Sequence, residues 1–214
     1  MGQGLEEQFD VVTLLGGLAQ LRPAFHSEAD FQHAFAQQIL ARHPAWKVRL
    51  ERPIRALGNA AVDVWVGTPT STVAVELKYL TKSASGEASG EAFHLRNHGA
   101  HDVRRYDVLK DVSRMERMRD TEVERALVIA LTNDPAYWTG PKRDDTNDAA
   151  FSLREGRVAS GELCWSSATG SGTMKNREAP LVLRGSYRLR WQDYAEETVE
   201  FGRFRFLLIE CLVD

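Results

Sequence analysis

The stretch VDVWVGTPTSTVAVELKY, residues 62–79, reads as two short apolar strands joined by a polar turn. Charged side chains interrupt both strands: Asp63 lies in the first, and Glu76 and Lys78 lie in the second. If Val66 faces Val73 across the turn, Asp63 faces Glu76, and side-chain alternation places Lys78 on the same face. A register shifted by two residues keeps this shared face but separates the two carboxylates diagonally, and the sequence does not fix the register.

Two opposed carboxylates repel each other, and partial burial strengthens the repulsion. Mg²⁺ or Mn²⁺ would offset it, because these ions prefer hard oxygen ligands. Lys78 could then hold an attacking water or neutralise charge in the transition state. The structural alternative is a solvated outer strand face. An isolated Glu-x-Lys favours that alternative, and the matched position of Asp63 reduces its weight.

The segment SEADFQHAFAQQILARH, residues 27–43, predicts a helix that has Ser27 as its N-cap and ends before Pro44. Its apolar stripe repeats at i, i+4 and i+8: Phe31, Phe35 and Ile39. Glu28 falls on the same stripe, although the helix dipole also favours a glutamate in the first turn. We therefore expect Glu28 to point toward the protein body and to meet the carboxylates of the hairpin.

The remaining elements read more coarsely. We predict, in chain order, a strand at Trp46–Ile54, a mobile Ser/Gly-rich loop at Thr81–Ala92, a helix at Val103–Met118, a strand at Arg125–Thr132 and a short helix beginning near Pro135. From Phe151 onward the patterns are those of β-strands. The sequence thus predicts a single domain, residues 1–214, of mixed α/β (α+β) class. It has a core at about 25–140 and a β-rich C-terminal extension at about 150–214.

Composition limits the function classes. The 214 residues carry a net charge of −3, which excludes a globally basic surface for nucleic acid. Cys164 and Cys211 lie far apart in the sequence and predict neither a zinc site nor a disulfide. No apolar run is long enough to span a membrane, and no basic segment precedes the short apolar patch at residues 11–15. We expect a cytoplasmic protein that does not associate with membranes.

In their order and faces, Asp63, the Glu76-Leu77-Lys78 triplet and Glu28 resemble the PD-(D/E)xK nuclease superfamily. Val62 stands where the family motif has proline. The resemblance implies a restriction-endonuclease-like αβββαβ core with a mixed central sheet. In that superfamily the Asp and the motif Glu bind catalytic Mg²⁺, the lysine assists the attacking water, and a helix Glu often contributes to the metal site. The resemblance therefore implies two sets of residues: the catalytic residues Asp63, Glu76, Lys78 and Glu28, and the metal ligands Asp63, Glu76 and the backbone carbonyl of Leu77.

Basic residues at the start of the second long helix are candidate substrate contacts. His101 and Arg105 fall near its inward face and suit a scissile phosphate, and Arg104 lies beside them. The alternative is that Arg105 pairs with a carboxylate and only holds the fold. A second basic stretch, interleaved with aromatic residues, lies in the C-terminal strands: Arg184, Tyr187, Arg188, Arg190 and Trp191. Such a stretch is typical of single-strand binding, although a solvated strand face explains it as well.

The sequence thus predicts a metal-dependent phosphodiesterase that acts on nucleic acid, most readily a DNA endonuclease. Two alternatives stay open. One is a non-catalytic nuclease-like module that binds nucleic acid or a protein. The other is a metal-dependent hydrolase of nucleotides or small phosphate esters. A homodimer is compatible with the sequence, but no segment identifies itself as an interface.

Overall fold

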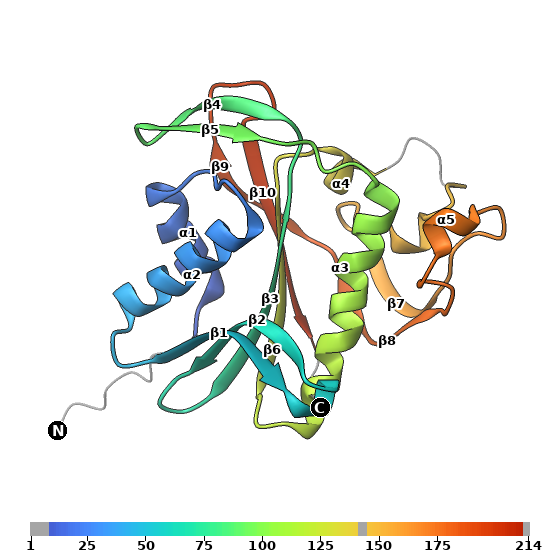
Figure 1. Cartoon of the computed structure of the whole chain (residues 1–214), viewed down its shortest axis with the longest axis horizontal. Coiled ribbons are helices and arrows are strands. Elements are labelled where there is room, and N and C mark those ends of the chain that lie inside the picture. Colours follow the sequence, from blue (N-terminus) through green and yellow to red (C-terminus); the bar gives the residue numbers. More distant parts are fainter. Residues whose placement is uncertain (1–8, 141–144, 212–214) are drawn as a thin grey trace.

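The computed structural model describes residues 9–140 and 145–211. A six-stranded sheet with the order β1-β2-β3-β6-β10-β9 forms its centre (Figure 1). Strands β3 and β6 are parallel and the other neighbours are antiparallel, which confirms the mixed α/β class. The strands of this sheet are β1 (Lys47–Ile54), β2 (Ala60–Gly67), β3 (Thr72–Leu80), β6 (Arg125–Thr132), β9 (Trp191–Glu196) and β10 (Arg203–Cys211).

Helices cover both faces of this sheet (Figure 1). On one face lie α1 (Val11–Leu21) and α2 (Glu28–Arg42), and on the other lies α3 (His101–Met115). Helix α2 begins as predicted, because the Ser27 side chain accepts a hydrogen bond from the Asp30 N–H. Shorter helices connect the strands: α4 (Ala136–Thr139), α5 (Ser171–Met174) and the 3₁₀ turns η1 (Arg55–Leu57), η2 (Glu116–Asp120) and η3 (Ala149–Phe151). None of the helices in the described ranges is long and apolar enough to cross a membrane.

The sheet separates two apolar cores. Alternate residues of β3 contribute to each of them, as the hairpin pattern predicted. Val73, Val75 and Leu77 pack with α1 and α2, whereas Ala74 packs with α3. Glu76 and Lys78 therefore extend from the face of the sheet that α3 covers. Val75 and Leu77 anchor the strand in the core on the opposite face.

The prediction of a mobile loop at Thr81–Ala92 is wrong, because most of it belongs to a hairpin. Its strands are β4 (Ala84–Ala88) and β5 (Glu91–Leu95). A Cβ added at Gly86 would lie 2.8 Å from Val199 Cγ1, so the glycine permits close packing. Gly86 thus lets the hairpin lie tightly against the protein, whereas Ser89 and Gly90, with φ of 52° and 80°, form its turn.

The C-terminal strands belong to two different sheets. Strand β10 pairs with β6 and β9 pairs with β10, so both complete the central sheet. Strands β7 (Val158–Leu163) and β8 (Leu181–Arg188) form a separate pair beside α3 (Figure 1). The predicted boundary near residues 140–150 therefore does not divide the central sheet from a separate extension.

Candidate functional site

Strands β2 and β3 separate where the hairpin carries its carboxylates. Their ladder pairs Val66 with Val73, which is the first of the two registers that the sequence left open. It ends at the pair Val64–Val75, one residue before Asp63 and Glu76 would pair. Beyond that pair, the backbone N–H of Leu77 donates to Asp63 Oδ2 at 2.6 Å. A side-chain carboxylate thus takes the place of a strand carbonyl, and β2 and β3 diverge beyond the pair Val64–Val75. We call this divergence, which carries Asp63, Glu76 and Leu77, the fork.

Helix α2 fills part of this fork. In the ladder between β1 and β2, Glu51 and Asp63 are not paired, although the residues on either side of them are. Glu51 has a φ of 49°, as in a β-bulge. Gln32 Nε2 donates to the Asp63 carbonyl oxygen and to Glu51 Oε1, each at 2.7 Å. The main chain at Asp63 is therefore held by a helix side chain, a role that the sequence did not reveal for Gln32.

Glu28 reaches the same fork from the first turn of α2. Its Oε2 accepts a hydrogen bond from the Tyr79 N–H at 2.8 Å. Two amides on the free edge of β3, those of Leu77 and Tyr79, are thus satisfied by carboxylates from two other elements. Glu28 points toward the sheet, which is the direction that its position on the apolar stripe predicted.

Glu76 lies at the base of the site, only 5% exposed. Its Oε1 contacts Arg114 Nη2 of α3 and lies 3.6 Å from Lys78 Nζ. Within the described ranges its Oε2 is buried without a hydrogen-bond partner. A buried carboxylate oxygen that lacks a partner is costly, so this atom marks a place for a cation or a bound water.

Lys78 is held in a fixed position beside Glu76. Its Nζ lies 3.1 Å from Asp111 Oδ2 and donates to the Leu77 carbonyl oxygen at 3.2 Å. Burial alone would lower the pKa of Lys78, but the surrounding carboxylates, Asp111 foremost, raise it above its ordinary value. Lys78 therefore stays an ammonium group, which can donate hydrogen bonds but cannot act as a base near neutral pH.

The carboxyl groups of the fork resist ionisation. Burial raises the pKa of Asp63 to about 6 and that of Glu76 to about 8. The Leu77 N–H opposes the shift at Asp63, whereas the negative charge of Glu28 adds to it. Asp111 and Asp63 add to the shift at Glu76. Burial and the crowding of carboxyl groups thus outweigh the stabilising effect of the neighbouring arginine and lysine.

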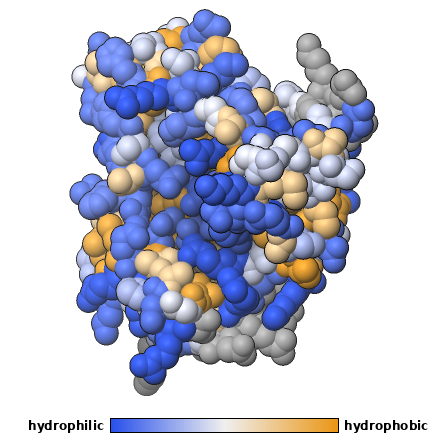
Figure 2. Space-filling view, turned by 45° about the vertical axis from the view of Figure 1, so that its right-hand side comes forward, coloured by the Kyte–Doolittle hydropathy of each residue, from blue (hydrophilic) through white to orange (hydrophobic). Residues whose placement is uncertain are grey.

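A cleft of about 950 Å³ opens above this cluster. Its lining includes five Lys or Arg residues and three Asp or Glu residues, although the whole chain carries a net charge of −3. The charged members are Lys78, Arg96, Arg104, Lys110, Arg114, Glu28, Asp107 and Asp111, and three histidines join them: His26, His94 and His98. Figure 2 shows hydrophilic side chains gathered around a hollow on the face that it presents. The cleft is the locally basic site that an acidic protein needs in order to bind a polyanion.

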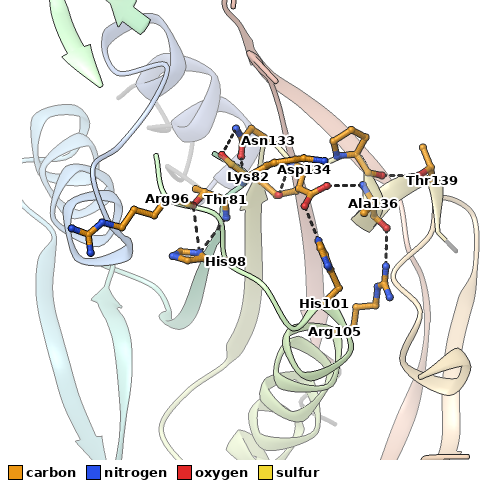
Figure 3. Close-up of polar contacts among 12 residues, drawn as sticks. Thr81, Lys82, Arg96, His98, His101, Arg105, Asn133, Asp134, Ala136 and Thr139 are labelled. Atoms are coloured by element: carbon orange, nitrogen blue, oxygen red, sulfur yellow. Dashed lines mark hydrogen bonds and ion pairs between the residues drawn. The ribbon is translucent and has the colours of Figure 1, made fainter. Parts of the chain in front are cut away.

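The three predicted substrate contacts lie in different surroundings. Arg104 lines the cleft with its side chain 45% exposed. Arg105 is 7% exposed and donates to Asp148 Oδ2 at 2.6 Å and to the Ala136 carbonyl oxygen. His101 Nε2 lies 2.7 Å from Asp134 Oδ2 (Figure 3). Arg105 and His101 therefore tie α3 to the segments after β6, outside the cleft lining, which favours a structural role for Arg105.

The oxygen atoms fit a hard divalent cation but do not form a complete cage. In residues 9–140 and 145–211, no group of three or more His, Cys, Asp or Glu side chains is arranged to hold a metal ion. The available donors are the carboxylates of Asp63 and Glu76 and the carbonyl of Leu77. Mg²⁺ often takes only one or two carboxylates and completes its shell with water and substrate phosphate. The partnerless oxygen of Glu76 is consistent with that donor set.

Comparisons of the chain with protein-family models, with curated proteins and with solved structures find no match. The function must therefore be argued from the side chains of the fork and the cleft.

Proposed function

We propose that the chain is a metal-dependent phosphodiesterase that hydrolyses nucleic acid, most readily DNA. The observation that carries the proposal is the buried, partnerless Oε2 of Glu76. The other oxygen of this carboxyl group, Oε1, lies 3.6 Å from the Nζ of Lys78, which lines the basic cleft. The chain order α2, β1, β2, β3, α3, β6 supports it, because the carboxylates occupy the positions of the PD-(D/E)xK pattern in this order, with the β4–β5 hairpin inserted before α3.

Asp63, Glu76 and the Leu77 carbonyl would hold Mg²⁺ or Mn²⁺. The bound cation would supply an acidified water ligand and offset charge on the phosphoryl group. Lys78 donates a hydrogen bond to the water or to a phosphoryl oxygen, and its ammonium charge favours the transition state. Asp111 keeps the Lys78 ammonium aimed at the fork.

Glu28 and Arg114 complete the electrostatics. Glu28 fixes the Tyr79 amide and adds negative charge that favours a cation. Arg114 donates to the Ala61 carbonyl oxygen at 2.9 Å and contacts Glu76, so it joins α3 to both β2 and β3.

The contact between Arg114 and Glu76 also favours a second candidate function. A guanidinium already neutralises one oxygen of Glu76, as expected for a nuclease-like module that binds nucleic acid without cleaving it. The two functions differ in whether the fork binds a divalent cation.

The test combines hydrolysis with metal binding. Plasmid DNA, single-stranded DNA and RNA are incubated with Mg²⁺ or Mn²⁺ and the wild-type chain, Glu76→Gln or Lys78→Met. Glu196→Gln and Lys175→Met are matched controls at positions outside the cleft lining. We expect both fork variants to lose hydrolysis by roughly 10²–10³-fold, since each removes a preorganised charge, and the controls to retain it.

Calorimetric titration with Mn²⁺ separates the two candidates. We expect binding to the wild-type chain and to Lys175→Met, and none to Glu76→Gln. A wild-type chain that takes up no Mn²⁺ and cleaves no substrate would exclude the hydrolase, and nucleic-acid binding by that same chain would support the binding module. Hydrolysis that survives both fork substitutions would place the chemistry elsewhere.

A further inference from the structure

The wall of the cleft formed by α3 is longer than one phosphate group requires. Its charged side chains recur at intervals of three or four residues along one side of the helix: Arg104, Asp107, Lys110, Asp111 and Arg114. Arg104 and Arg114 are ten residues apart, which corresponds to about 15 Å of α-helix. A single strand that keeps its bases stacked advances about as far per nucleotide as a duplex strand, about 3.4 Å, so this wall matches roughly four nucleotides of such a strand.

Two cations of the cleft are free to bind phosphate. In the part of the chain that the structure describes, neither the Arg96 guanidinium nor the Lys110 ammonium has a hydrogen-bond or ion-pair partner. Arg96 follows β5, whereas Lys110 lies on α3, so the two come from different elements of the lining. Figure 3 shows the Arg96 side chain extending away from the network around Asp134. Such unpaired cations favour a polyanion that contacts both elements.

His98 adds a donor with a fixed orientation. The Thr81 N–H donates to His98 Nδ1 at 3.2 Å, and the His98 N–H donates to the Thr81 carbonyl oxygen at 2.7 Å (Figure 3). Because Nδ1 accepts a hydrogen bond, the neutral ring carries its proton on Nε2. The ring lines the cleft, so it offers an N–H donor to an oxyanion there without a reorientation of the side chain.

The shape of the cleft favours a single strand of nucleic acid over a duplex. Glu76 is 5% exposed, and the neighbouring Asp111 and Arg114 are also mostly buried, so the reacting groups lie at the floor of the cleft. The cleft has a volume of about 950 Å³, the size of a small-ligand pocket, so it admits a short stretch of one strand but not the full width of a duplex. A single strand can bend and enter.

Among the described residues that line the cleft, histidine rings are available for stacking, but no phenylalanine or tryptophan ring is. The tyrosine of the lining, Tyr79, has its ring buried in the core, and its hydroxyl oxygen accepts the Phe25 N–H. Binding must therefore depend mainly on phosphate contacts, which predicts a strong dependence on salt and little dependence on base sequence.

We infer that the cleft accepts one polynucleotide strand of about four nucleotides, in preference to an intact duplex or a mononucleotide. Arg96, His98, Arg104 and Lys110 contact the phosphates that flank the scissile one. The inference rests on the proposed function in placing the scissile phosphate beside Lys78.

The experiment measures binding by fluorescence anisotropy in EDTA, where no divalent cation supports hydrolysis. The probes are labelled DNA and RNA strands of two, four and eight nucleotides and an eight-base-pair duplex, with a mononucleotide as competitor. We expect affinity to rise steeply from two to four nucleotides and little thereafter, and the duplex to bind at least tenfold more weakly. With three or four phosphates contacted, log K should fall against log salt with a slope of about −2 to −3, by about 0.7 for each phosphate contacted.

Variants assign the contacts. Arg96→Ala and Lys110→Ala should each reduce the magnitude of the slope by about 0.7. Arg188→Ala is the matched control, because Arg188 is exposed on β8 outside the cleft lining, within the second basic stretch. Duplex binding as tight as strand binding, full competition by the mononucleotide, or a slope that falls only in Arg188→Ala would overturn the inference. Strand binding without later cleavage in Mg²⁺ would contradict the proposed function alone.

Discussion

Replacing Asp63 by asparagine should stabilise the fold at neutral pH while it abolishes hydrolysis. The asparagine side chain keeps an oxygen that can accept the Leu77 N–H, which Asp63 Oδ2 accepts at 2.6 Å in the wild-type chain. It removes the negative charge that adds to the raised pKa of Glu76. The substitution therefore separates the structural task of this side chain from its electrostatic task.

The magnitude follows from the raised pKa of Asp63, from 3.8 to about 6. A carboxyl group whose pKa is raised by folding stabilises the protein fully below the unfolded value, and this stability is lost as pH rises through the folded value. The wild-type chain thus carries a penalty of about 1 kcal/mol at pH 4.5 and up to about 3 kcal/mol at pH 7.5. Asparagine carries no such penalty, so its advantage should grow over this interval.

The assay is urea unfolding followed by tryptophan fluorescence at both pH values. Asp63→Ala is the control, because it removes the charge together with the acceptor for Leu77 and should forfeit about 1–3 kcal/mol of the gain. Mg²⁺ at 100 times its Kd should stabilise the wild-type chain by about 2.7 kcal/mol and leave the asparagine variant unchanged. If Asp63→Asn unfolds at a lower urea concentration than the wild-type chain at pH 7.5, Asp63 stabilises the fold as an ordinary ion pair, and the argument from crowded carboxylates is wrong.

Further substitutions test other parts of the structure. Arg105→Ala leaves the buried Asp148 carboxylate unpaired and should lower the free energy of unfolding in urea by about 3–5 kcal/mol. Arg104→Ala should leave this free energy unchanged and weaken strand binding. Equal losses of stability in the two variants would contradict this assignment. Gly86→Ala places a Cβ 2.8 Å from Val199 Cγ1 and should cost on the order of 1–3 kcal/mol, measured as a lower Tm. Mn²⁺ binding should release protons, because carboxyl groups with raised pKa values must ionise to bind it, and the release should decrease between pH 6 and pH 8.5. Calorimetry in buffers of different ionisation enthalpy measures that release, and binding without it would count against these ligands.

The local elements around the site could be predicted from sequence because their signals are short-ranged. A capping serine and an apolar stripe gave the helix at residues 28–42, and strand alternation gave the two faces of β3. The pairing of β10 with β6 could not be predicted, since the sheet joins segments about seventy residues apart and neither strand encodes its neighbour. The β4–β5 hairpin was missed because its Gly and Ala residues have low strand propensity; Gly86 permits close packing, and Gly90 lies at the positive φ of the turn. Helix α1 was not predicted, although Asp10 caps it by accepting the Val12 and Thr13 N–H groups.

Some of the charged residues of α3 and β1 that contribute to the site were also not predicted from the sequence. Asp111 and Arg114 were not predicted to belong to the site, yet they approach each other to 3.4 Å and Arg114 contacts Glu76 in the interior. A signal was present for Asp111, which stands three residues after Val108 and four before Met115 and so borders the buried stripe. The same reasoning had directed Glu28 inward. The bulge at Glu51 carried no comparable signal, because a positive φ at a non-glycine residue is imposed by its surroundings.

The fork in the sheet allows the site to be monitored by NMR spectroscopy in the absence of substrate. Two amides of β3 are bound to carboxylates, where a neighbouring strand would ordinarily supply carbonyls. Drawing those carboxylates toward an ion must lengthen the hydrogen bonds to the Leu77 and Tyr79 amides. The nuclear resonance frequencies and isotope-exchange rates of these amides therefore serve as built-in reporters of the charge state of the centre.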